Sequence, residues 1–431
     1  MSNDGKTIYF TDNRETDKNQ LKSFNIPTEK LNTAASSPNT DILPFGNLLN
    51  TRHRPAIAVS IFAKSQQHLV DTAYAEDLAI LQKKIKGDLS FAGQSQDGQV
   101  LLIREFTGGP QNLYRYQRQT KELVFLLNEI PHLAGKSLAQ RTAHSVITTD
   151  SMELPIHVYL PPGKDTDQDG IPQDPLPTLL YVHGGPWVGL IHFNSWLHLR
   201  HYQLLANRGY AVVVCEFRGT TGLGKKLIEA SYKKWGTDMA RDKVDIAEWL
   251  VQQKITDKDK IGIWGWSYGG YAALAGVSLL PQTYACGISL YGPTALQADS
   301  AAPSFHDPFW KFQVGDPATD QALLRAQSPR YHAQNFKDPV LITTGSQDSR
   351  VPKAGVDAMA EALHQTGKDV TYFYYPNEGH DFRQKSSWVS FWALAEQFLQ
   401  KYLDGQSEPL GDDLDAPGFA IVFDPHHFYN P

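Results

Sequence analysis

A serine stands among glycines in the segment GIWGWSYGGYAAL (262–274), where a short apolar run passes into an alanine-rich run. A serine hydroxyl is a weak nucleophile until a base accepts its proton and its oxygen is presented to the substrate without obstruction. In the pattern G-x-S-x-G, the serine occupies a strained turn between a strand and a helix, where glycines leave room for it. Gly265–Gly269 therefore predicts a nucleophilic Ser267, against the alternative of an ordinary tight glycine turn.

Two further residues could complete a catalytic triad with Ser267. Asp348 ends the apolar run PVLITTGSQD, and His380 ends the run VTYFYYPNEGH. The order Ser, Asp, His along the chain is that of an α/β-hydrolase, and both positions follow expected strands. His380 would act as general base toward Ser267 and then as general acid toward the leaving group, oriented by Asp348. Either residue alone would more often be a surface or capping residue, so the prediction depends on all three in order.

Acyl transfer also needs two N–H donors directed at the oxyanion. The backbone N–H of Tyr268, directly after the nucleophile, is the first candidate. The second candidate is the N–H of Gly185 in LLYVHGGPW, where two glycines follow an apolar run and let the backbone approach closely. A plain turn is the alternative for this glycine pair.

The elements that must position these residues change character along the chain. Residues 1–140 hold short alternating segments, such as KTIYFTDNR and QVLLIREF, which predict half-buried strands, with one helix at AEDLAILQKKI. Residues 141–405 hold apolar runs separated by helical patterns, which predict a mostly parallel, doubly wound sheet with helices on both faces. Residues 406–431 are acidic and poor in apolar side chains at their start, and are expected to form a tail along the surface.

Composition argues against several classes of function. A hydrophobic content of 41% and a charged content of 20% are typical of a folded protein. The formal net charge of -6 provides no basic footprint for nucleic acid, and no apolar run reaches the roughly 18 to 20 residues of a membrane span. The first ten residues lack the pattern of a secretory signal. The chain as written is therefore expected to be cytoplasmic, and its two cysteines, in apolar segments, to be buried side chains.

One acidic segment resembles the beginning of a calcium loop, with Asp165, Asp167, Asp169 and Gly170 at the expected spacing. Leu176 stands where that loop requires a bidentate glutamate. An ordinary acidic surface turn is therefore favoured over a calcium site, and no metal or cofactor is expected.

Motifs spread over residues 140–411 resemble one family in order. They are VHGGPW, NRGYAVVVCEFRGTTGLGK, WGTDMARDKVDIAEWL, GWSYGGYAAL, VGDPAT, GSQDSRVP, NEGHDF and EPLG. Together they are similar to the prolyl oligopeptidase family of serine peptidases, in particular to its acylaminoacyl-peptidase-like bacterial branch. The resemblance implies a β-propeller ahead of an α/β-hydrolase domain, cleavage of peptides, and no cofactor.

The resemblance also implies roles for individual residues. The triad deduced from spacing falls on the family's triad. Arg350 falls on an arginine that holds a substrate backbone carbonyl, a task suited to a guanidinium with several fixed donors, although a surface salt bridge is the alternative. Phe309 and Trp310 fall where the family lines its specificity pocket, but they could equally be core residues. His183, which we also place at the substrate site, stands where prolyl-specific members carry a tyrosine, so proline specificity is not expected.

The first domain departs from the family pattern. Closed propellers need at least four blades, commonly of about 40 to 45 residues, and residues 1–140 supply only about three. We therefore expect a partial propeller, either shortened at its amino end or naturally open. An open ring would expose an edge strand able to pair with another chain, which makes a homo-oligomer one expectation. A longer parent chain would make a periplasmic or secreted location the alternative.

Three functional hypotheses follow from the sequence. The leading one is a serine peptidase that hydrolyses short acylaminoacyl- or oligopeptides through an acyl-enzyme. The second is a carboxylesterase, because the same triad cleaves esters. The third is a catalytically silent fragment that serves as a binding module.

Overall fold

The structure is a computed structural model that describes residues 1–44, 48–133, 135–189, 196–280, 282–297, 307–414 and 418–428. The chain divides into two compact units, which we describe separately. The first consists of Met1–Ala143, Gly189–Gln203 and Thr220–Ile228, and the second of His144–Val188, Leu204–Gly219 and Glu229–Pro431.

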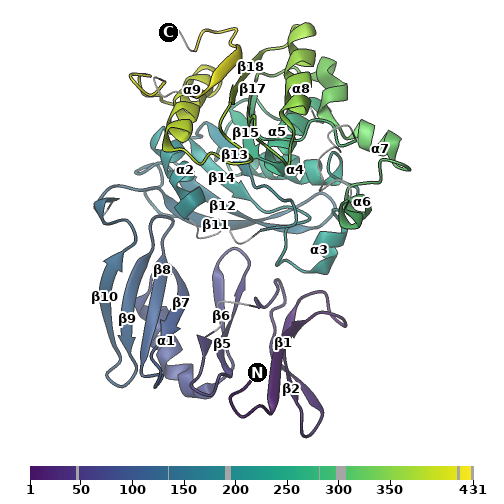
Figure 1. Cartoon of the computed structure of the whole chain (residues 1–431). Helices are drawn as coiled ribbons and strands as arrows, with labels where there is room; N and C mark the ends of the chain where they lie inside the picture. The colour runs from purple at the N-terminus through teal and green to yellow at the C-terminus, as the bar shows by residue number, and fades with distance from the viewer. Residues whose placement is uncertain are drawn as a thin grey trace. The chain divides into compact units, whose positions relative to one another are not determined.

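The first unit is built from three small antiparallel sheets (Figure 1). The first contains β1 (Thr7–Asp12), β2 (Gln20–Asn25) and β3 (Lys30–Ala35), and the second contains β4 (Leu48–Leu49), β5 (Pro55–Ile61) and β6 (Ser65–Leu69). The third, in the order β10-β9-β8-β7, contains β7 (Asp88–Gln94), β8 (Val100–Phe106), β9 (Asn112–Gln117) and β10 (Glu122–Asn128). Several of these strands alternate buried with less buried side chains, because successive side chains point to opposite faces of a sheet. In β8, for example, Leu101 and Ile103 are buried between less buried neighbours.

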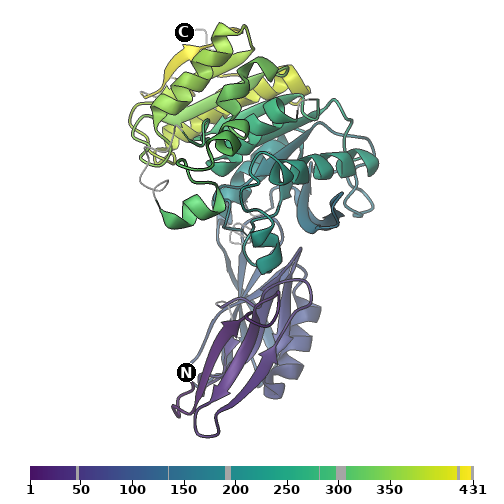
Figure 2. The ribbon, with the colours of Figure 1, turned by 90° about the vertical axis from the view of Figure 1, so that its right-hand side faces the viewer.

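Helix α1 (Ala75–Lys84) supplies part of the core of this unit, and Figure 2 shows it alongside the strands. Leu78 and Leu81 of the helix belong to one buried cluster with Leu101 and Ile103 of β8. The helix begins after Asp71, whose side chain accepts a hydrogen bond from the N–H of Ala73 in the preceding 3-10 turn (Thr72–Tyr74). The predicted helix and strands of this region are thus present.

The second unit contains a nine-stranded sheet in the order β11-β12-β14-β13-β15-β16-β17-β18-β19. Its strands are β11 (Gln140–Ile147), β12 (Glu153–Leu160), β13 (Thr178–Val182), β14 (Ala211–Cys215), β15 (Ile261–Trp266), β16 (Cys286–Leu290), β17 (Val340–Gly345), β18 (Val370–Tyr375) and β19 (Ala420–Phe423). The six strands from β14 to β18 are parallel, as the apolar runs predicted. Every residue of β13, β16 and β17 is buried, because helices cover both faces of such a sheet.

The helices follow the strands in alternation. They are α2 (Trp196–Asn207), α3 (Lys225–Glu229), α4 (Asp238–Gln252), α5 (Tyr268–Leu279), α6 (Pro308–Gln313), α7 (Gln321–Ala326), α8 (Lys353–Gln365) and α9 (Lys385–Leu403). Figure 1 shows α8 and α9 on either side of β17 and β18. In the part of the chain that the structure describes, no helix combines the length and hydropathy needed to cross a membrane.

The final strand lies in the segment that we expected to be a surface tail. Backbone pairing joins β19 antiparallel to β18, with Tyr374 opposite Ala420 and Tyr372 opposite Phe423. The short run AIVF thereby extends the sheet at its edge, with side chains that are mostly half-buried. The sequence analysis did not predict this strand, because four residues carry too little periodicity.

A buried ion-pair network ties α4 to the loop after β14. The guanidinium of Arg218 lies 2.6 Å from the carboxylate of Asp242 and 2.9 Å from that of Asp150. The side chains of Arg218 and Asp242 are 3% and 0% exposed. Hydrogen bonding from Arg218 lowers the pKa of Asp150 to about 2, so Asp150 stays ionised over the neutral pH range.

We expect Arg218→Leu to lower the free energy of unfolding by about 3 to 5 kcal/mol, because Asp242 would keep a buried charge without its partner. Urea denaturation followed by tryptophan fluorescence measures the change. Lys234→Met is the matched control, since Lys234 pairs with Asp238 at the surface, where both side chains are more than 40% exposed. The control should change stability by less than about 1 kcal/mol, and equal losses in the two variants would contradict the network's importance.

Candidate active site

Ser267 lies at the sharp turn between β15 and α5. Its φ of 57° and ψ of -123° are sparsely populated by residues other than glycine, so the turn holds local strain. The surrounding structure compensates with two backbone hydrogen bonds. The N–H of Ser267 donates to the carbonyl of Leu290 at 2.8 Å, and its own carbonyl accepts from the N–H of Tyr271 at 3.0 Å. Ser267 is partly exposed, so its hydroxyl is accessible to a substrate.

The glycines around Ser267 are required by close backbone contacts. A Cβ atom on either Gly265 or Gly269 would overlap the carbonyl oxygen of Val182, the last residue of β13. A Cβ on Gly270 would lie 2.6 Å from the carbonyl oxygen of Leu290. The turn and the neighbouring strand end therefore pack backbone against backbone, which explains the G-x-S-x-G-G spacing.

The structure brings Ser267, His380 and Asp348 together. His380 Nε2 lies 3.0 Å from Ser267 Oγ, and His380 Nδ1 lies 2.7 Å from Asp348 Oδ2. An ionised carboxylate only accepts hydrogen bonds, so Nδ1 carries the proton and Nε2 is free to accept from the serine hydroxyl. The side chain of Asp348 is 0% exposed and that of His380 is 17% exposed. The arrangement supplies a nucleophile, a base and a group that orients the base.

The loop after β17 fixes the carboxylate of Asp348. Its Oδ1 accepts hydrogen bonds from the N–H groups of Arg350 at 2.8 Å and Val351 at 2.9 Å, while Oδ2 is left for the imidazole. These bonds hold the carboxylate with one oxygen directed at His380.

Glu378 fixes the loop that carries His380, and the sequence analysis did not single it out. It is 1% exposed and accepts hydrogen bonds from the N–H groups of Arg383 and Gln384 and from the hydroxyl of Ser387. Its carbonyl accepts from the N–H of Gln347, which joins the histidine loop to the aspartate loop. The only signal in the sequence was a glutamate two positions before the histidine, and many surface loops share that feature.

The segment HGGP lies beside the nucleophile. A Cβ on Gly184 would lie 3.2 Å from Cβ of Ser267, so the loop after β13 passes directly against the serine. Gly185 has a φ of 119°, a conformation that favours glycine. Tyr268 is the first residue of α5, where helix geometry leaves the N–H groups without intrahelical partners and directs the positive end of the helix dipole at the serine.

His183 supports the glycine loop from behind. Its side chain is 2% exposed, with Nδ1 2.7 Å from the carbonyl oxygen of Gly184 and Nε2 3.1 Å from the carboxylate of Glu216. Its ring stacks on Phe217 at a centroid distance of 4.4 Å. A direct contact between His183 and substrate stays a prediction.

The predicted pocket residues belong to a chain of aromatic contacts. Phe309 and Trp310 of α6 contact the ring of Trp187 at centroid distances of 5.4 and 5.9 Å. Trp310 also contacts Trp235 at 5.2 Å, and Trp235 contacts Tyr268, the neighbour of the nucleophile, at 4.7 Å. Phe309 is 54% exposed, which is unusual for a core phenylalanine and suits an apolar surface near the site.

The guanidinium of Arg350 is exposed at the surface of the loop that carries Asp348. Among the described residues, no carboxylate lies within ion-pair distance of it, so the surface salt bridge considered as an alternative is not observed there. Five donors therefore remain available for another molecule.

The acidic segment at residues 165–170 lies apart from the triad in the sequence. The carboxylates of Asp165, Asp167 and Asp169 have oxygens within 4.8 Å of one another, and Asp165 accepts from the N–H groups of Asp169 and Gly170, as in an acidic turn.

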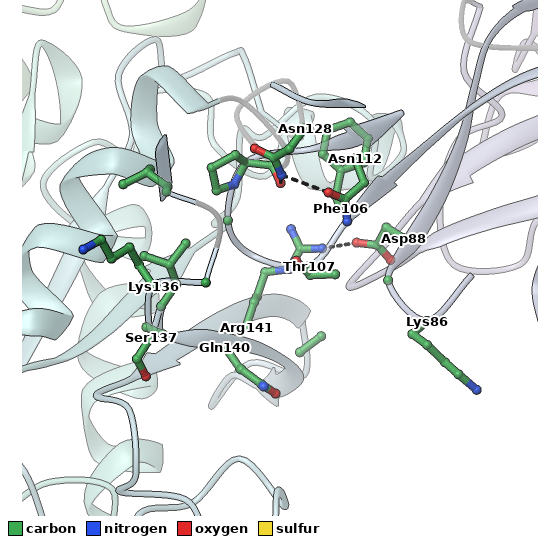
Figure 3. Close-up of a pocket in the computed structure, with 18 of the residues that line it drawn as sticks. Lys86, Asp88, Phe106, Thr107, Asn112, Asn128, Lys136, Ser137, Gln140 and Arg141 are labelled. Atoms are coloured by element: carbon green, nitrogen blue, oxygen red, sulfur yellow. Dashed lines mark hydrogen bonds and ion pairs between the residues drawn. The ribbon is translucent and has the colours of Figure 1, made fainter. Parts of the chain in front are cut away.

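A pocket of about 810 Å³ lies in the first unit, and none of the triad residues lines it. Figure 3 shows that Arg141 is paired with Asp88 there and Asn128 with Asn112. Arg141, one of the positive side chains that line this pocket, is therefore already paired.

Comparison with known proteins places these residues in context. Residues 196–406 match the prolyl oligopeptidase family. Dipeptidyl aminopeptidase BIII of Pseudoxanthomonas mexicana is 33% identical over 426 residues, which cover 97% of this chain and 61% of that protein. Dipeptidyl peptidase family member 6 of Caenorhabditis elegans is 30% identical over 390 residues, covering 84% of this chain and 52% of that protein. The chain thus spans between one half and two thirds of the length of these two relatives.

Solved structures agree on the fold. A puromycin-hydrolyzing peptidase of Mycobacterium tuberculosis matches with a TM-score of 0.77 at 19% identity, covering 94% of this chain and 62% of that structure. The predicted fold class, an α/β-hydrolase unit preceded by a partial β-propeller, is confirmed. The matched segment 196–406 contains Ser267, Asp348 and His380, and this segment of the chain therefore belongs to the prolyl oligopeptidase family.

Proposed function

We propose that this protein is a serine peptidase that hydrolyses short peptides through an acyl-enzyme. The observation that carries the proposal is the relay of two hydrogen bonds, 3.0 Å from Ser267 Oγ to His380 Nε2 and 2.7 Å from His380 Nδ1 to Asp348 Oδ2. Membership of the prolyl oligopeptidase family and the names of the relatives, which are dipeptidyl peptidases, support peptides as the substrate class.

In the first half of the reaction, Ser267 Oγ attacks the scissile carbonyl carbon while His380 Nε2 takes the hydroxyl proton. The carbonyl oxygen becomes an oxyanion, which the N–H groups of Tyr268 and Gly185 would stabilise. The tetrahedral intermediate then collapses, and the C–N bond breaks as His380 returns its proton to the leaving amine. Ser267 is left as an ester of the acyl part of the peptide.

In the second half, water replaces the amine. His380 Nε2 accepts a proton from the water as its oxygen attacks the ester, and a second oxyanion forms at the same place. Collapse breaks the bond to Oγ, and His380 returns the proton to Ser267. Asp348 keeps its charge throughout and stabilises the imidazolium that forms twice in each cycle.

Two features outside the triad favour peptides over simple esters. The exposed guanidinium of Arg350 could hold a backbone carbonyl of the peptide, because its donors are fixed in a plane and unpaired among the described residues. The aromatic group around Trp187, Trp310 and Phe309 offers an apolar surface for a substrate side chain. Ester substrates need neither contact, so a carboxylesterase would leave both unexplained.

We expect a fluorophosphonate to label the wild-type chain at Ser267 and not to label Ser267→Ala. Asp348→Asn should reduce kcat by about 10⁴-fold, the loss seen when a triad aspartate can no longer select the right imidazole tautomer. Labelling is measured by intact mass, and kcat with dipeptidyl and N-acylaminoacyl p-nitroanilides.

Three outcomes separate the hypotheses. Labelling with cleavage of the anilides supports the peptidase. Labelling with cleavage of short-chain aryl esters alone would indicate a carboxylesterase. If Ser267 is not labelled, the protein would be a catalytically silent fragment that serves as a binding module. The assay uses the 431-residue chain itself, because it spans only part of the length of its relatives.

We expect Arg350→Met to raise KM for the peptide anilides about tenfold, since it removes a contact with the bound backbone, while fluorophosphonate labelling changes by less than about twofold. Lys258→Met is the control, because Lys258 is exposed and lies in the loop before β15, at the opposite edge of the sheet from the triad. If KM is unchanged in Arg350→Met, Arg350 does not contact the bound substrate.

A further inference from the structure

Lys243 on α4 is a buried lysine beneath the proposed active site. The side chain is 1% exposed, although lysine is rarely buried unless its charge is paired. The carboxylate beside it in the chain, that of Asp242, receives four hydrogen bonds from Arg218. Within the described residues, no carboxylate lies within ion-pair distance of the Lys243 amino group. Its charge is held instead by a carbonyl, a hydroxyl and aromatic rings.

The contacts of Lys243 are specific. Its Nζ donates to the carbonyl oxygen of Met239 at 2.7 Å and to the hydroxyl of Tyr268 at 3.0 Å. The same atom lies 3.5 Å from the ring centroid of Phe217 and 5.1 Å from that of Tyr268. A desolvated ammonium is attracted by the face of an aromatic ring, which partly offsets the cost of burying the charge.

One aromatic partner of Lys243, Tyr268, belongs to a segment that would bind the oxyanion, and the other, Phe217, contacts the second such segment. Tyr268 supplies the proposed N–H donor next to the nucleophile. Phe217 stacks on His183, which directly precedes Gly184 and Gly185 in the loop that would supply the second donor. Phe217 and Tyr268 also contact one another at 5.2 Å. The ammonium group of Lys243 therefore contacts Tyr268 directly and is linked through the ring of Phe217 to His183, next to the second donor.

We infer that Lys243 is a positioning residue, whose ammonium group holds Tyr268 and Phe217 in place and thereby sets the geometry of the two oxyanion donors. This inference rests on the proposed function, because it concerns the oxyanion site of that reaction. It assigns Lys243 no contact with substrate and no transfer of a proton to it.

The position of Lys243 also makes the site sensitive to pH. Burial lowers its pKa from the usual value to about 7, while the charge of Asp242 acts to raise the pKa and that of Arg218 acts to lower it. Burial raises the pKa of the Cys215 thiol to about 12 and that of Tyr268 well above its usual value, so both facing groups remain neutral. Arg218, hydrogen-bonded to Asp242 and Asp150, stays charged through neutral pH, and burial brings the pKa of Lys243 into that range.

The contribution of Lys243 to the rate depends on whether its amino group is protonated. Below pH 7 the ammonium is charged and holds Phe217 by its cation–π contact. Above pH 7 the neutral amine loses that contact, and the support of the oxyanion site weakens. The contribution of Lys243 to the rate should therefore decline as the pH rises through about 7.

The test compares wild type with Lys243→Met, which keeps the unbranched shape and removes the charge. We expect kcat at pH 6 to fall about tenfold with KM within twofold, because the oxyanion contacts form only in the transition state. This loss is smaller than the roughly 100- to 1000-fold expected for removing a donor outright. The ratio of wild-type to variant kcat should fall toward about 2 at pH 9.

Tyr268→Phe probes the same contact from the other side, because it deletes the hydroxyl and keeps the backbone N–H. It should also lower kcat, and the double variant should be no slower than the slower single variant, since both changes break one interaction. Tyr268→Phe keeps the inference testable if Lys243→Met does not fold. Lys258→Met, in the loop at the far edge of the sheet, should change neither kcat nor its pH profile.

The outcomes distinguish this inference from the proposed function. If wild type shows no Ser267-dependent labelling, the proposed function fails and the inference fails with it. If wild type is active and folded Lys243→Met has the same kcat and pH profile, only the role of Lys243 is overturned. A loss of kcat that is equal at every pH, or strictly additive with Tyr268→Phe, would indicate a structural lysine that does not act through Tyr268.

Discussion

One imidazole, that of His380, must reach a hydroxyl and a carboxylate that come from two other strand ends. The second unit meets this constraint because β15, β17 and β18 run parallel, so the turns that follow them lie at the same edge of the sheet. The distances of 3.0 and 2.7 Å from the ring nitrogens to their partners require each loop to be held firmly. The N–H groups after Asp348 and the buried carboxylate of Glu378 provide that restraint.

The same constraint explains why the nucleophile turn is strained. Ser267 adopts a positive φ so that its side chain leaves the end of β15 toward the imidazole, and glycines allow the turn to pack on the carbonyl of Val182. Strain at one residue typically costs about 1 to 3 kcal/mol and persists only where the surroundings over-determine it. Here the surroundings are two sheet strands and the helix α5, all fully buried at the contact.

Two buried cations beneath the site, Arg218 and Lys243, differ in the groups that they contact. Among the described residues, Arg218 pairs with the carboxylates of Asp242 and Asp150, whereas the neighbouring Lys243 contacts neutral groups. Two cations that lie close together in the fold are thus in opposite situations. The paired one joins α4 to the loop after β14, and the one without a carboxylate partner contacts the hydroxyl and the ring of Tyr268 beside the nucleophile.

The sequence by itself determined the elements and the order of the chemistry: the strand and helix around Ser267, the apolar runs that end at Asp348 and His380, and the glycine pair at 184–185. Those features are local, because periodicity and turn residues act over a few positions. Only the tertiary structure decided the roles of Lys243, Glu378 and Trp187 and the pairing of β19. Lys243 meets Tyr268 across 25 residues and Trp187 meets Phe309 across more than 100, and no local pattern encodes a contact between side chains so far apart in the chain.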